Sequence, residues 1–442
     1  MYISHTMFHE DTCFDGDTMY NNISYNQSKR IIVKKSRLEG KVSISGAKNS
    51  ALKLLTASLL TDDDVTIYNY PANLLDAQIH VQMLEKLGKR CEVTSDQIFI
   101  SWDSTQKEEL IWKGPSIRNT LLIFGALLTR QGKAKVPLPG GCLLGDRKYD
   151  LHRMVLEKLG AEIWTENNCL CGEAAGGLTG TDIELPIRST GATENTIIAG
   201  CLAKGVTVLW GPHIRPEVID LISFLRSMGS KIDVHGQESI HIHGVESLHG
   251  TRYKVIVDNL EAITYLIAAV VTQGDIEIDN FPYSSLEIPL IYLRESGARL
   301  FRNKDTLIVR GEKCYPVEIS TGPYPGINSD MQPLFAVYGL CAKGKSRITD
   351  LRFPERFGYA EELKKLGGKM SVQNNILLVE GGWPLTGTEV TALDLRCGAS
   401  LILAGLISNG TTIINNANQI IRGYEHIDKK LQTLGGTVYF ET

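Results

Sequence analysis

The sequence contains no long apolar run and no surplus of positive charge. No stretch approaches the ~20 apolar residues that a membrane span requires, and the longest candidate, residues 265–271, predicts a buried helix instead. Lys and Arg number 46 against 50 Asp and Glu, so the net charge is −4 at pH 7. Nucleic-acid-binding proteins normally carry a basic surplus. We therefore expect neither a membrane nor a nucleic acid as a partner.

Cysteine is present but follows no framework pattern. The nine cysteines are odd in number and scattered, which argues against disulfides and favours a reducing, cytoplasmic location. Cys169 and Cys171 have no second pair at zinc-binding spacing, so we expect two ordinary thiols on a strand. Residues 1–29 lack the basic start and apolar stretch of a secretory signal, and we expect residues 1–30 to form a flexible extension.

The strongest pattern in the chain is a sixfold repeat. Six times a predicted helix ends in a leucine-and-glycine signature and the chain then turns into an apolar strand. The six glycines are Gly88, Gly160, Gly229, Gly297, Gly367 and Gly435. Subtracting consecutive positions gives spacings of 72, 69, 68, 70 and 68 residues. Such regularity predicts one supersecondary unit used six times.

Each repeat predicts a unit of roughly βαβαβ type. An apolar helix and then an amphipathic helix alternate with strands, and an alternating strand such as residues 231–234 or 437–440 closes the unit. A chain of 442 residues is long for one core and suits two domains of about 200 residues each. We predict an α/β (α+β) fold with three units in each of two domains, rather than a solenoid, because the loops differ so much in character.

Two loop positions recur in the units, one before each helix, and most lie at predicted helix N-termini. Free backbone N–H groups and the helix dipole favour anions at such places. Converging cations repel one another unless an anionic ligand offsets them, and guanidinium groups bind carboxylate and phosphate bidentately. We infer a substrate with several negative charges. The cations at these positions are Lys48, Arg118, Arg147, Arg356, Arg396 and Arg422.

Two of these loops also carry a candidate reactive group. Gly140 and Gly141 precede Cys142 in a tightly turned loop, and Arg147 can favour its thiolate, so we favour a reactive thiol over a buried structural cysteine. Asp330 is the only carboxylate of its loop. It is either a helix N-cap or, among the arginines, a general base that they keep ionised.

These loops resemble motifs of the enolpyruvyl transferases, above all those that act on UDP-N-acetylglucosamine. The resemblance covers about residue 31 to the C-terminus. The motifs are Ser45-Gly46-Ala47-Lys48-Asn49, Pro139-Gly140-Gly141-Cys142 with Gly145 and Arg147, Asp150-Leu151-His152, Pro216-Glu217 with Asp220, Asp330-Met331-Gln332, Glu355-Arg356, Asp394-Leu395-Arg396 and Arg422-Gly423-Tyr424-Glu425. The sister enzymes that use shikimate 3-phosphate lack the Gly-Gly-Cys loop.

The resemblance implies an architecture and a reaction. Each domain would be an inside-out α/β barrel with pseudo-threefold symmetry, residues 31–47 and 258–442 forming domain 1 and residues 48–257 forming domain 2, and the two would close on ligand. Enolpyruvate would pass from phosphoenolpyruvate to the 3-hydroxyl of UDP-N-acetylglucosamine, through a tetrahedral intermediate and with release of phosphate, as a step of peptidoglycan synthesis. No metal or cofactor is implied.

The resemblance also implies roles for individual residues. Lys48, Arg147 and Arg422 would bind the phosphate of phosphoenolpyruvate, Lys48 also serving catalysis. Arg356 and Arg396 would hold the carboxylate, and Arg118 would support the loop and phosphate. Cys142 would act as acid at the methylene carbon or form an adduct there, and would be the target of fosfomycin. Asp330 would take the proton of the acceptor hydroxyl. The implied nucleotide-binding residues are Asn49, Arg147, Asp150, Leu151, Ser189, Gly191, Asp330 and Arg352.

The acceptor side of this chain departs from the family pattern. The loop at residues 258–264 has lost an arginine and a glycine of the family. The substituted positions are Lys148, Arg215, Arg352, Gln419 and Ile421. Because the phosphoenolpyruvate residues are intact, this pattern leaves the acceptor open between UDP-N-acetylglucosamine and another uridine nucleotide, such as UMP in a nucleoside antibiotic-type pathway.

Two readings from other classes have less support. A nucleotide-binding paralogue without catalysis should have lost costly charges and reactive groups first, yet Cys142, Asp330 and all six cations remain. RNA-end chemistry on a similar repeated fold would need a nucleotidylated histidine and a basic groove. The chain has no suitable histidine motif and a net charge of −4.

Overall fold

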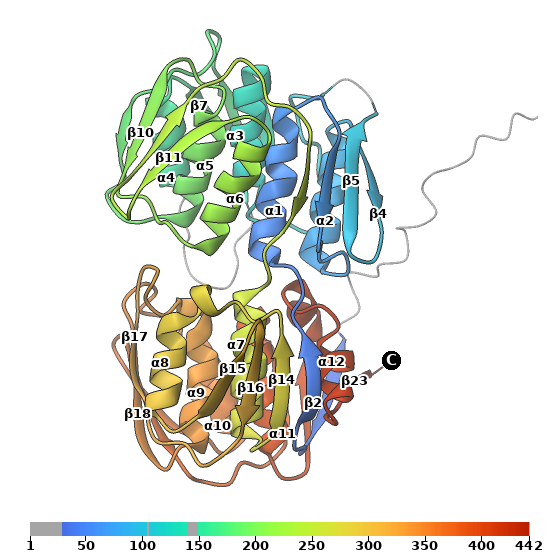
Figure 1. The fold of residues 1–442 in the computed structure, drawn as a ribbon, viewed down its shortest axis with the longest axis vertical. Helices are drawn as coiled ribbons and strands as arrows, with labels where there is room; N and C mark the ends of the chain where they lie inside the picture. The colour runs from blue at the N-terminus through green and yellow to red at the C-terminus, as the bar shows by residue number, and fades with distance from the viewer. Residues whose placement is uncertain (1–28, 104–105, 140–148, 442) are drawn as a thin grey trace, which may run out of the picture.

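A computed structural model of the chain describes residues 29–103, 106–139 and 149–441. It contains two domains, one above the other in Figure 1, with the chain crossing between them twice. One hydrophobic core contains residues between 51 and 255, and the other contains residues 31–44 and 260–438. We call the domain built on the first core domain 2 and the domain built on the second core domain 1.

The described residues of domain 2 form three sheets. The first has the strand order β13 (Thr251–Lys254), β3 (Val65–Tyr68), β5 (Gln97–Trp102) and β4 (Lys89–Val93). The second has the order β6 (Lys133–Pro137), β8 (Cys169–Glu173) and β7 (Glu162–Glu166). The third has the order β11 (Lys231–His235), β12 (Ser239–His243), β10 (Val206–Trp210) and β9 (Asp182–Glu184). Cys169 and Cys171 are free thiols on β8, as predicted.

Domain 1 also has three sheets. The first has the order β15 (Arg299–Asn303), β16 (Thr306–Arg310), β14 (Asp275–Asp279) and β2 (Glu39–Ser43). The second has the order β17 (Glu318–Thr321), β18 (Gly344–Asp350), β20 (Ile376–Gly381) and β19 (Lys369–Gln373). The third has the order β21 (Glu389–Thr391), β22 (Thr411–Asn415), β1 (Arg30–Lys34) and β23 (Thr437–Glu441). Each four-stranded sheet of both domains combines one parallel pair with two antiparallel pairs.

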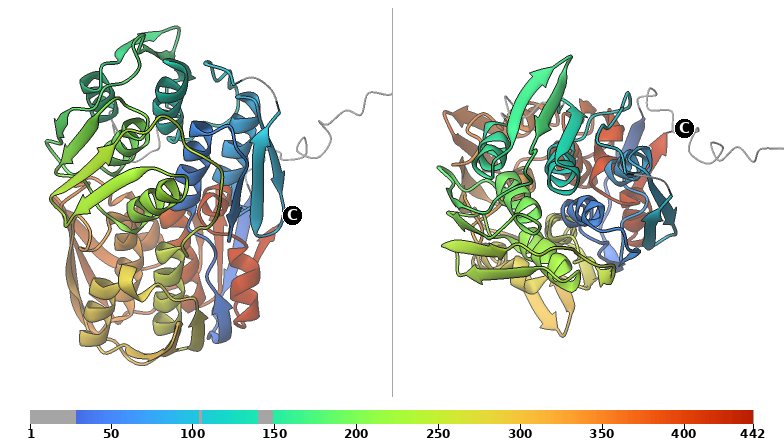
Figure 2. Two further views of the ribbon diagram at one scale, coloured as in Figure 1. Left: turned by 45° about the horizontal axis from the view of Figure 1, so that its top comes forward. Right: turned by 90° about the horizontal axis from the view of Figure 1, so that it is seen from above.

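The apolar helix of each unit lies inside its domain, and the amphipathic helix lies nearer the surface. The inner helices are α1 (Lys48–Ala57), α3 (Thr120–Gln131), α5 (Thr190–Gly200), α7 (Asn259–Val271), α9 (Gln332–Cys341) and α11 (Leu395–Ile407). All 13 residues of α7 are buried, including the run predicted as a buried helix. The inner helices of a domain pack on one another, and seen from above the sheets lie toward the rim (Figure 2). This is the predicted inside-out α/β barrel with three units per domain.

The leucine-and-glycine signatures end the outer helices, as predicted. These are α2 (Leu75–Lys86), α4 (Asp150–Lys158), α6 (Pro216–Ser227), α8 (Glu287–Glu295), α10 (Gly358–Lys365) and α12 (Ile427–Thr433). All six signature glycines have positive φ, between 84° for Gly435 and 103° for Gly88. Glycine reaches this left-handed backbone region without a Cβ clash, so it stops the helix and turns the chain into the next strand.

The two crossing segments pair with each other between the domains. Gly46 and Val257 form an antiparallel bridge, and the N–H of Ala47 donates to the carbonyl of Ile256 at 2.7 Å. A Cβ on Gly46 would lie 1.8 Å from the carbonyl oxygen of Asn69, so this position requires glycine. The crossing is therefore a two-segment connection rather than a single flexible linker. The domain boundaries at 47/48 and 257/258 stay a prediction.

The predicted N-terminal extension lies outside the described residues up to position 28, and Arg30 already opens β1. In the part of the chain that the structure describes, no helix has the length and apolar character of a membrane span.

Candidate functional site

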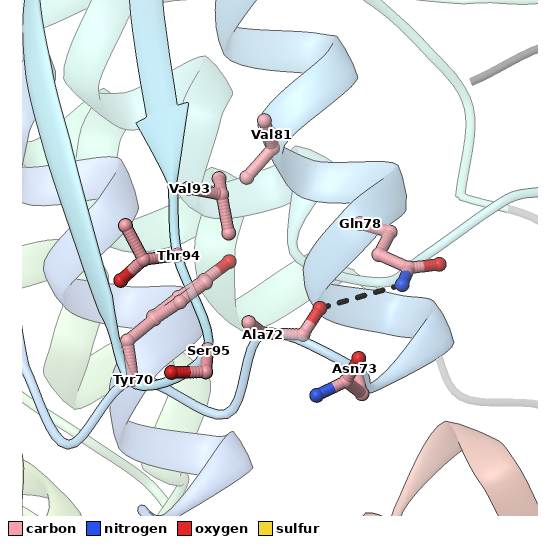
Figure 3. A pocket seen from close by; sticks show the side chains of 8 residues that line it. All are labelled: Tyr70, Ala72, Asn73, Gln78, Val81, Val93, Thr94 and Ser95. Atoms are coloured by element: carbon pink, nitrogen blue, oxygen red, sulfur yellow. Dashed lines mark hydrogen bonds between the residues drawn. The ribbon is translucent and has the colours of Figure 1, made fainter. Parts of the chain in front are cut away.

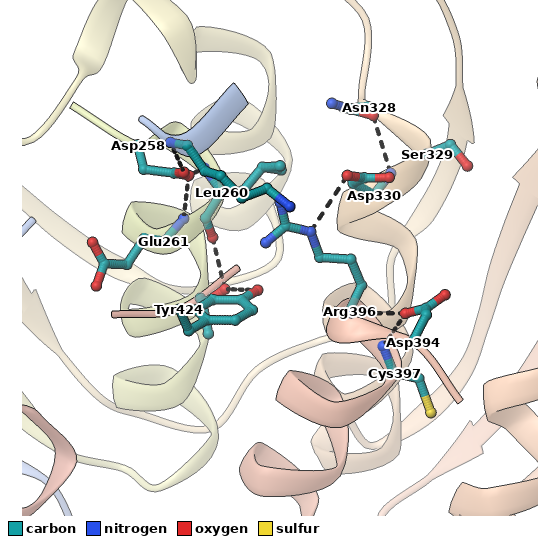
Figure 4. Close-up of polar contacts among 12 residues, drawn as sticks. Asp258, Leu260, Glu261, Asn328, Ser329, Asp330, Asp394, Arg396, Cys397 and Tyr424 are labelled. Carbon is teal, nitrogen blue, oxygen red and sulfur yellow. Dashed lines mark hydrogen bonds and ion pairs between the residues drawn. The ribbon is translucent and has the colours of Figure 1, made fainter. Parts of the chain in front are cut away.

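The carboxylate of Asp330 lies between two arginines of domain 1. Asp330 belongs to the 3-10 helix η4 (Ser329–Met331); its Oδ1 accepts from Nη1 of Arg356 at 2.6 Å and its Oδ2 from Nε of Arg396 at 3.3 Å. Figure 4 shows Arg396 reaching from α11 toward this carboxylate. The capping position of η4 is filled by Asn328, whose side chain accepts the N–H of Asp330 at 3.0 Å. The Asp330 carboxylate is thus available to the arginines.

Each of the two arginines has an N–H donor that no described residue accepts. Arg356 is 8% exposed and Arg396 1% exposed. Within residues 29–103, 106–139 and 149–441, Nε of Arg356 and Nη1 of Arg396 have no hydrogen-bond partner. A buried donor without an acceptor is costly, so such donors usually meet a ligand or water. The arrangement therefore suits a second carboxylate beside Asp330.

The arginines keep Asp330 ionised. Burial by itself would raise the pKa of this carboxyl, but the charges of Arg356 and Arg396, the hydrogen bond from Arg356 and the charge of Arg215 outweigh burial and hold the pKa well below its usual range. Arg215 precedes α6 in domain 2 and is itself paired with Glu217, Nε to Oε2 at 2.9 Å. The site around Asp330 thus draws charge from both domains.

A second charged cluster joins the two domains. Nζ of Lys48, the first residue of α1, lies 3.0 Å from Oδ2 of Asp76 in α2. Nε of Arg422, which ends the 3-10 helix η5 (Ala417–Arg422) of domain 1, lies 2.8 Å from Oδ1 of the same carboxylate. Lys48 is 6% exposed and Asp76 5% exposed. The cluster therefore brings together two of the predicted phosphate-binding cations, one from each domain.

The predicted residues of the glycine-rich loop, Cys142 and Arg147, lie outside the described residues. Arg118 lies in the turn before α3 in domain 2. Burial, together with the charges of Arg118 and Lys53, lowers the pKa of the nearby His152 to about 3. The structure thus places Arg118 beside the start of α4, the helix that follows the glycine-rich loop.

The predicted nucleotide-binding residues divide between the domains. Asn49 lies in α1, Asp150 and Leu151 begin α4, and Gly191 lies in the first turn of α5, where a Cβ would meet the ring of His152 at 2.6 Å. Ser189 caps α5 by accepting the N–H of Ala192. Asp330 and Arg352 belong to domain 1. Arg352 lies in a loop, and its backbone N–H donates to Oδ1 of Asp350 at 2.8 Å.

Asp76 is the residue of this region that sequence reasoning missed. Each outer helix has an acidic residue in its first turn: Asp76, Asp150, Glu217, Glu287, Glu361 and Asp428. Negative charge there favours the helix dipole in every unit. Only Asp76 and Glu217 of the six are buried. Aligning the repeats would have found all six, but the sequence does not show which two are buried.

A cavity of about 380 Å³ lies in domain 2, beside the start of α2. Figure 3 shows its eight lining residues, none of which carries a charge. They are Tyr70, Ala72, Asn73, Gln78, Val81, Val93, Thr94 and Ser95. Such a lining does not suit an anionic substrate. In the described part of the chain, no group of three or more His, Cys, Asp and Glu side chains is arranged to hold a metal ion.

The sequence is similar to known carboxyvinyltransferases over most of its length. It is 38% identical over 417 residues to UDP-N-acetylglucosamine 1-carboxyvinyltransferase 1 of Caldanaerobacter subterraneus subsp. tengcongensis, covering 93% of this chain and 99% of the relative. It is 40% identical over 410 residues to UDP-N-acetylglucosamine 1-carboxyvinyltransferase of Shewanella woodyi, covering 91% and 96%. These alignments extend across both domains.

Solved structures and a family model agree with these relatives. The enolpyruvyl transferase NikO from Streptomyces tendae superposes with a TM-score of 0.84 at 25% identity, covering 94% of this chain and 99% of that one. EPSP synthase from Acinetobacter baumannii shares the fold, with a TM-score of 0.76 at 18% identity and coverage of 94% and 100%. The model of the EPSP synthase (3-phosphoshikimate 1-carboxyvinyltransferase) family matches residues 32–431. The chain belongs to this family of enolpyruvyl (carboxyvinyl) transferases.

Proposed function

We propose that this enzyme transfers enolpyruvate from phosphoenolpyruvate to the 3-hydroxyl of UDP-N-acetylglucosamine and releases phosphate, a step of peptidoglycan precursor synthesis. The observation that carries the proposal is the site around Asp330. One ionised carboxylate lies between Arg356 and Arg396, each of which keeps a buried N–H donor without a partner among the residues that the structure describes. A base beside a ready carboxylate-binding site is what transfer from a carboxylated donor to a hydroxyl requires.

The two charged clusters would divide phosphoenolpyruvate between them. Arg356 and Arg396 would bind its carboxylate with their spare N–H groups. Lys48 and Arg422 would bind its phosphate, together with Arg147, and Arg118 would support this phosphate site. Because Arg422 and Lys48 come from different domains, binding the phosphate would favour closure of the domains.

The chemistry would proceed by addition and elimination. Asp330 would take the proton of the acceptor hydroxyl while the hydroxyl oxygen attacks C2 of phosphoenolpyruvate. Cys142 would give a proton to the methylene carbon or form an adduct with phosphoenolpyruvate. The tetrahedral intermediate would then expel phosphate and return a methyl proton to the thiolate of Cys142, which restores the double bond and the thiol. Lys48 would offset the charge of the leaving phosphate.

The nucleotide would lie across the opening between the domains. The contacts on the domain 2 side would be Asn49, Arg147, Asp150, Leu151, Ser189 and Gly191, and those on the domain 1 side Asp330 and Arg352. Ser189 and Gly191 lie at the N-terminus of α5, where backbone N–H groups suit the diphosphate. The cytoplasmic location stays a prediction.

The direct test measures phosphate release from phosphoenolpyruvate with UDP-N-acetylglucosamine as the sole acceptor. We expect release to require the acceptor and to fall at least about 100-fold in the Cys142→Ala variant, which should still bind the nucleotide. A parallel reaction contains UMP instead. Release with UMP alone would assign the enzyme to a different acceptor, and release with neither would remove the proposed transfer.

A further inference from the structure

The carboxylate of Asp76 occupies the place where the two phosphate-binding cations meet. Its Oδ2 accepts from Lys48 at 3.0 Å and its Oδ1 from Arg422 at 2.8 Å. The side chain of Asp76 is 8% exposed, as is that of Lys48, and that of Arg422 is 27% exposed. Water therefore screens these charges poorly. Asp76 belongs to domain 2 but pairs with one cation from each domain.

The same carboxylate must face the phosphate that binds there. A phosphate oxygen within hydrogen-bond distance of Lys48 Nζ or Arg422 Nε, about 3 Å, lies within about 6 Å of an Asp76 oxygen, because each nitrogen is already within 3.0 Å of that carboxylate. Near pH 7 free phosphate and a phosphate ester have similar negative charges. Asp76 therefore repels both, but free phosphate lacks the carboxylate by which Arg356 and Arg396 would hold the substrate, so the repulsion weakens retention of the product more.

Asp76 remains ionised in this position. Burial by itself would raise the pKa of its carboxyl, but the charges of Lys48 and Arg422 and their hydrogen bonds outweigh burial and lower the pKa. The charge is thus present throughout the neutral range. When phosphate is bound, its own negative charge offsets the positive charges of Lys48 and Arg422. The charge of Asp76 is then not needed to neutralise them.

We propose that Asp76 is a positioning residue that competes with phosphate for Lys48 and Arg422, holding both cations in place in the empty site and hastening release of the phosphate product. This inference rests on the proposed function, because it takes the phosphate of the donor to bind these two cations. It assigns to Asp76 a role in product release rather than in the bond-making step.

A purely structural role for Asp76 would make it a tie between the domains. The structure already has a second tie beside it. The backbone N–H and Nδ2 of Asn73 both donate to Oε1 of Glu425 in domain 1, at 2.9 and 3.0 Å. Asn73 precedes α2 and Glu425 follows Arg422 by three residues, so the same two segments stay connected without Asp76.

The test compares the affinity of the whole enzyme for inorganic phosphate in three forms. The Asp76→Asn variant keeps the shape and one acceptor oxygen but loses the charge. We expect it to bind inorganic phosphate at least tenfold more tightly than wild type in titration calorimetry, with binding of the uridine nucleotide unchanged. The Glu425→Gln control, which removes the charge of the neighbouring tie, should change phosphate affinity less than twofold.

A kinetic measurement tests the second half of the proposal. In the Asp76→Asn variant, slower phosphate release should give a burst of enolpyruvyl product followed by a lower steady rate, and Asp76→Glu should restore the wild-type time course. Unchanged or weaker phosphate binding by a folded Asp76→Asn variant overturns the inference while leaving the transfer reaction in place. Wild-type enzyme that turns over neither acceptor would instead overturn the proposed function, since phosphate binding is measured without turnover.

Discussion

At the scale of single residues, the pKa of a carboxyl group in this protein depends on the cations around it. Asp330 and Asp76 are each accompanied by two cations, and both pKa values are lowered. Glu194 in α5 is also buried, more so than Asp330, but the nearest cation atom, Nζ of Lys53, is 4.0 Å from its Oε2, and its Oε1 has no partner among the described residues. Acidic residues are therefore ionised where two cations accompany them, and only weakly paired where they lie in the core of domain 2.

Replacing Asp330 by asparagine should remove the base without removing the side chain. An amide cannot take a proton from the acceptor hydroxyl, so we expect turnover to fall at least about 100-fold. Nucleotide affinity, measured by calorimetry, should change much less than turnover. Glu389→Gln on β21 is the matched control, because Glu389 is an exposed carboxylate that accepts from Nδ2 of Asn415 at 2.8 Å. Comparable turnover in both variants would contradict the role of Asp330.

Glu194 should make stability depend on pH. Burial raises the pKa of its carboxyl from 4.5 to about 7, against the lowering effect of Lys53 and Arg215, with Glu217 raising it further. The native state then binds more protons than the unfolded state between these pH values, so stability is lost as pH rises from about 4.5 through about 7. The loss amounts to about 3 kcal/mol. Urea unfolding at pH 5 and pH 8 measures it.

The Glu194→Gln variant is the control for this pH effect, since it keeps the shape but cannot titrate. Its free energy of unfolding should fall less between pH 5 and pH 8 than that of wild type. Parallel pH curves for the two proteins would show that Glu194 is ionised in the native state at both pH values.

At the scale of elements, the inner helices pack so closely that small residues are required between them. Gly125 in α3 faces α5, and a Cβ at this position would lie 1.8 Å from Oδ1 of Asn195. Asn195 donates from Nδ2 to the carbonyl of Leu121 at 3.1 Å, so it is held from α3 and cannot easily withdraw. The close approach of α3 and α5 therefore depends on glycine at position 125.

We expect Gly125→Ala to destabilise the protein by about 1–3 kcal/mol, because the added methyl group forces α3 and α5 apart. Gly176→Ala is the matched control: it adds the same methyl group where nothing lies within 4 Å, and should change stability by less than about 0.5 kcal/mol. Urea or thermal unfolding of the two variants measures the difference. Equal stability would mean that the helices relax without cost.

At the scale of the whole molecule, a partly buried ion pair holds the first crossing segment between the domains. Nζ of Lys430 in α12 lies 2.6 Å from Oε1 of Glu261 in α7 and 2.6 Å from Oγ of Ser45, in the first crossing segment. Oε2 of Glu261 accepts the backbone N–H of Ser45 at 2.7 Å. Arg422 and Glu425 lie just before α12, so one segment contacts the crossing and also reaches domain 2.

Lys430→Met should destabilise the protein by about 3 kcal/mol, because it leaves the Glu261 carboxylate, whose side chain is 3% exposed, without its cation. The double variant Lys430→Met/Glu261→Gln should regain part of this stability. Lys364→Met, which breaks the exposed pair with Glu361, is the control and should cost less than about 1 kcal/mol. Chemical unfolding of the four proteins measures these differences, and a double variant no more stable than Lys430→Met would contradict the pairing.

The sequence by itself determined the repeated unit and the family. Strands, helices and their ends follow from neighbouring residues, and a glycine with positive φ ends each outer helix whatever the rest of the chain does. Clustered motifs such as Asp394-Leu395-Arg396 also stay recognisable without coordinates. Cys142 and Arg147 lie outside the described residues, so their roles stay predictions from the sequence.

Only the tertiary structure decided which charges meet. Asp76 and Arg422 are 346 residues apart in the chain, and their contact depends on how α2 of domain 2 and η5 of domain 1 approach each other. Local sequence gives all six outer helices an acidic first turn, so it cannot distinguish Asp76 from Glu361, which is exposed. Burial and long-range pairing set the pKa of an acidic residue and the energy of its interactions with cations. Both arise only when the whole chain has folded.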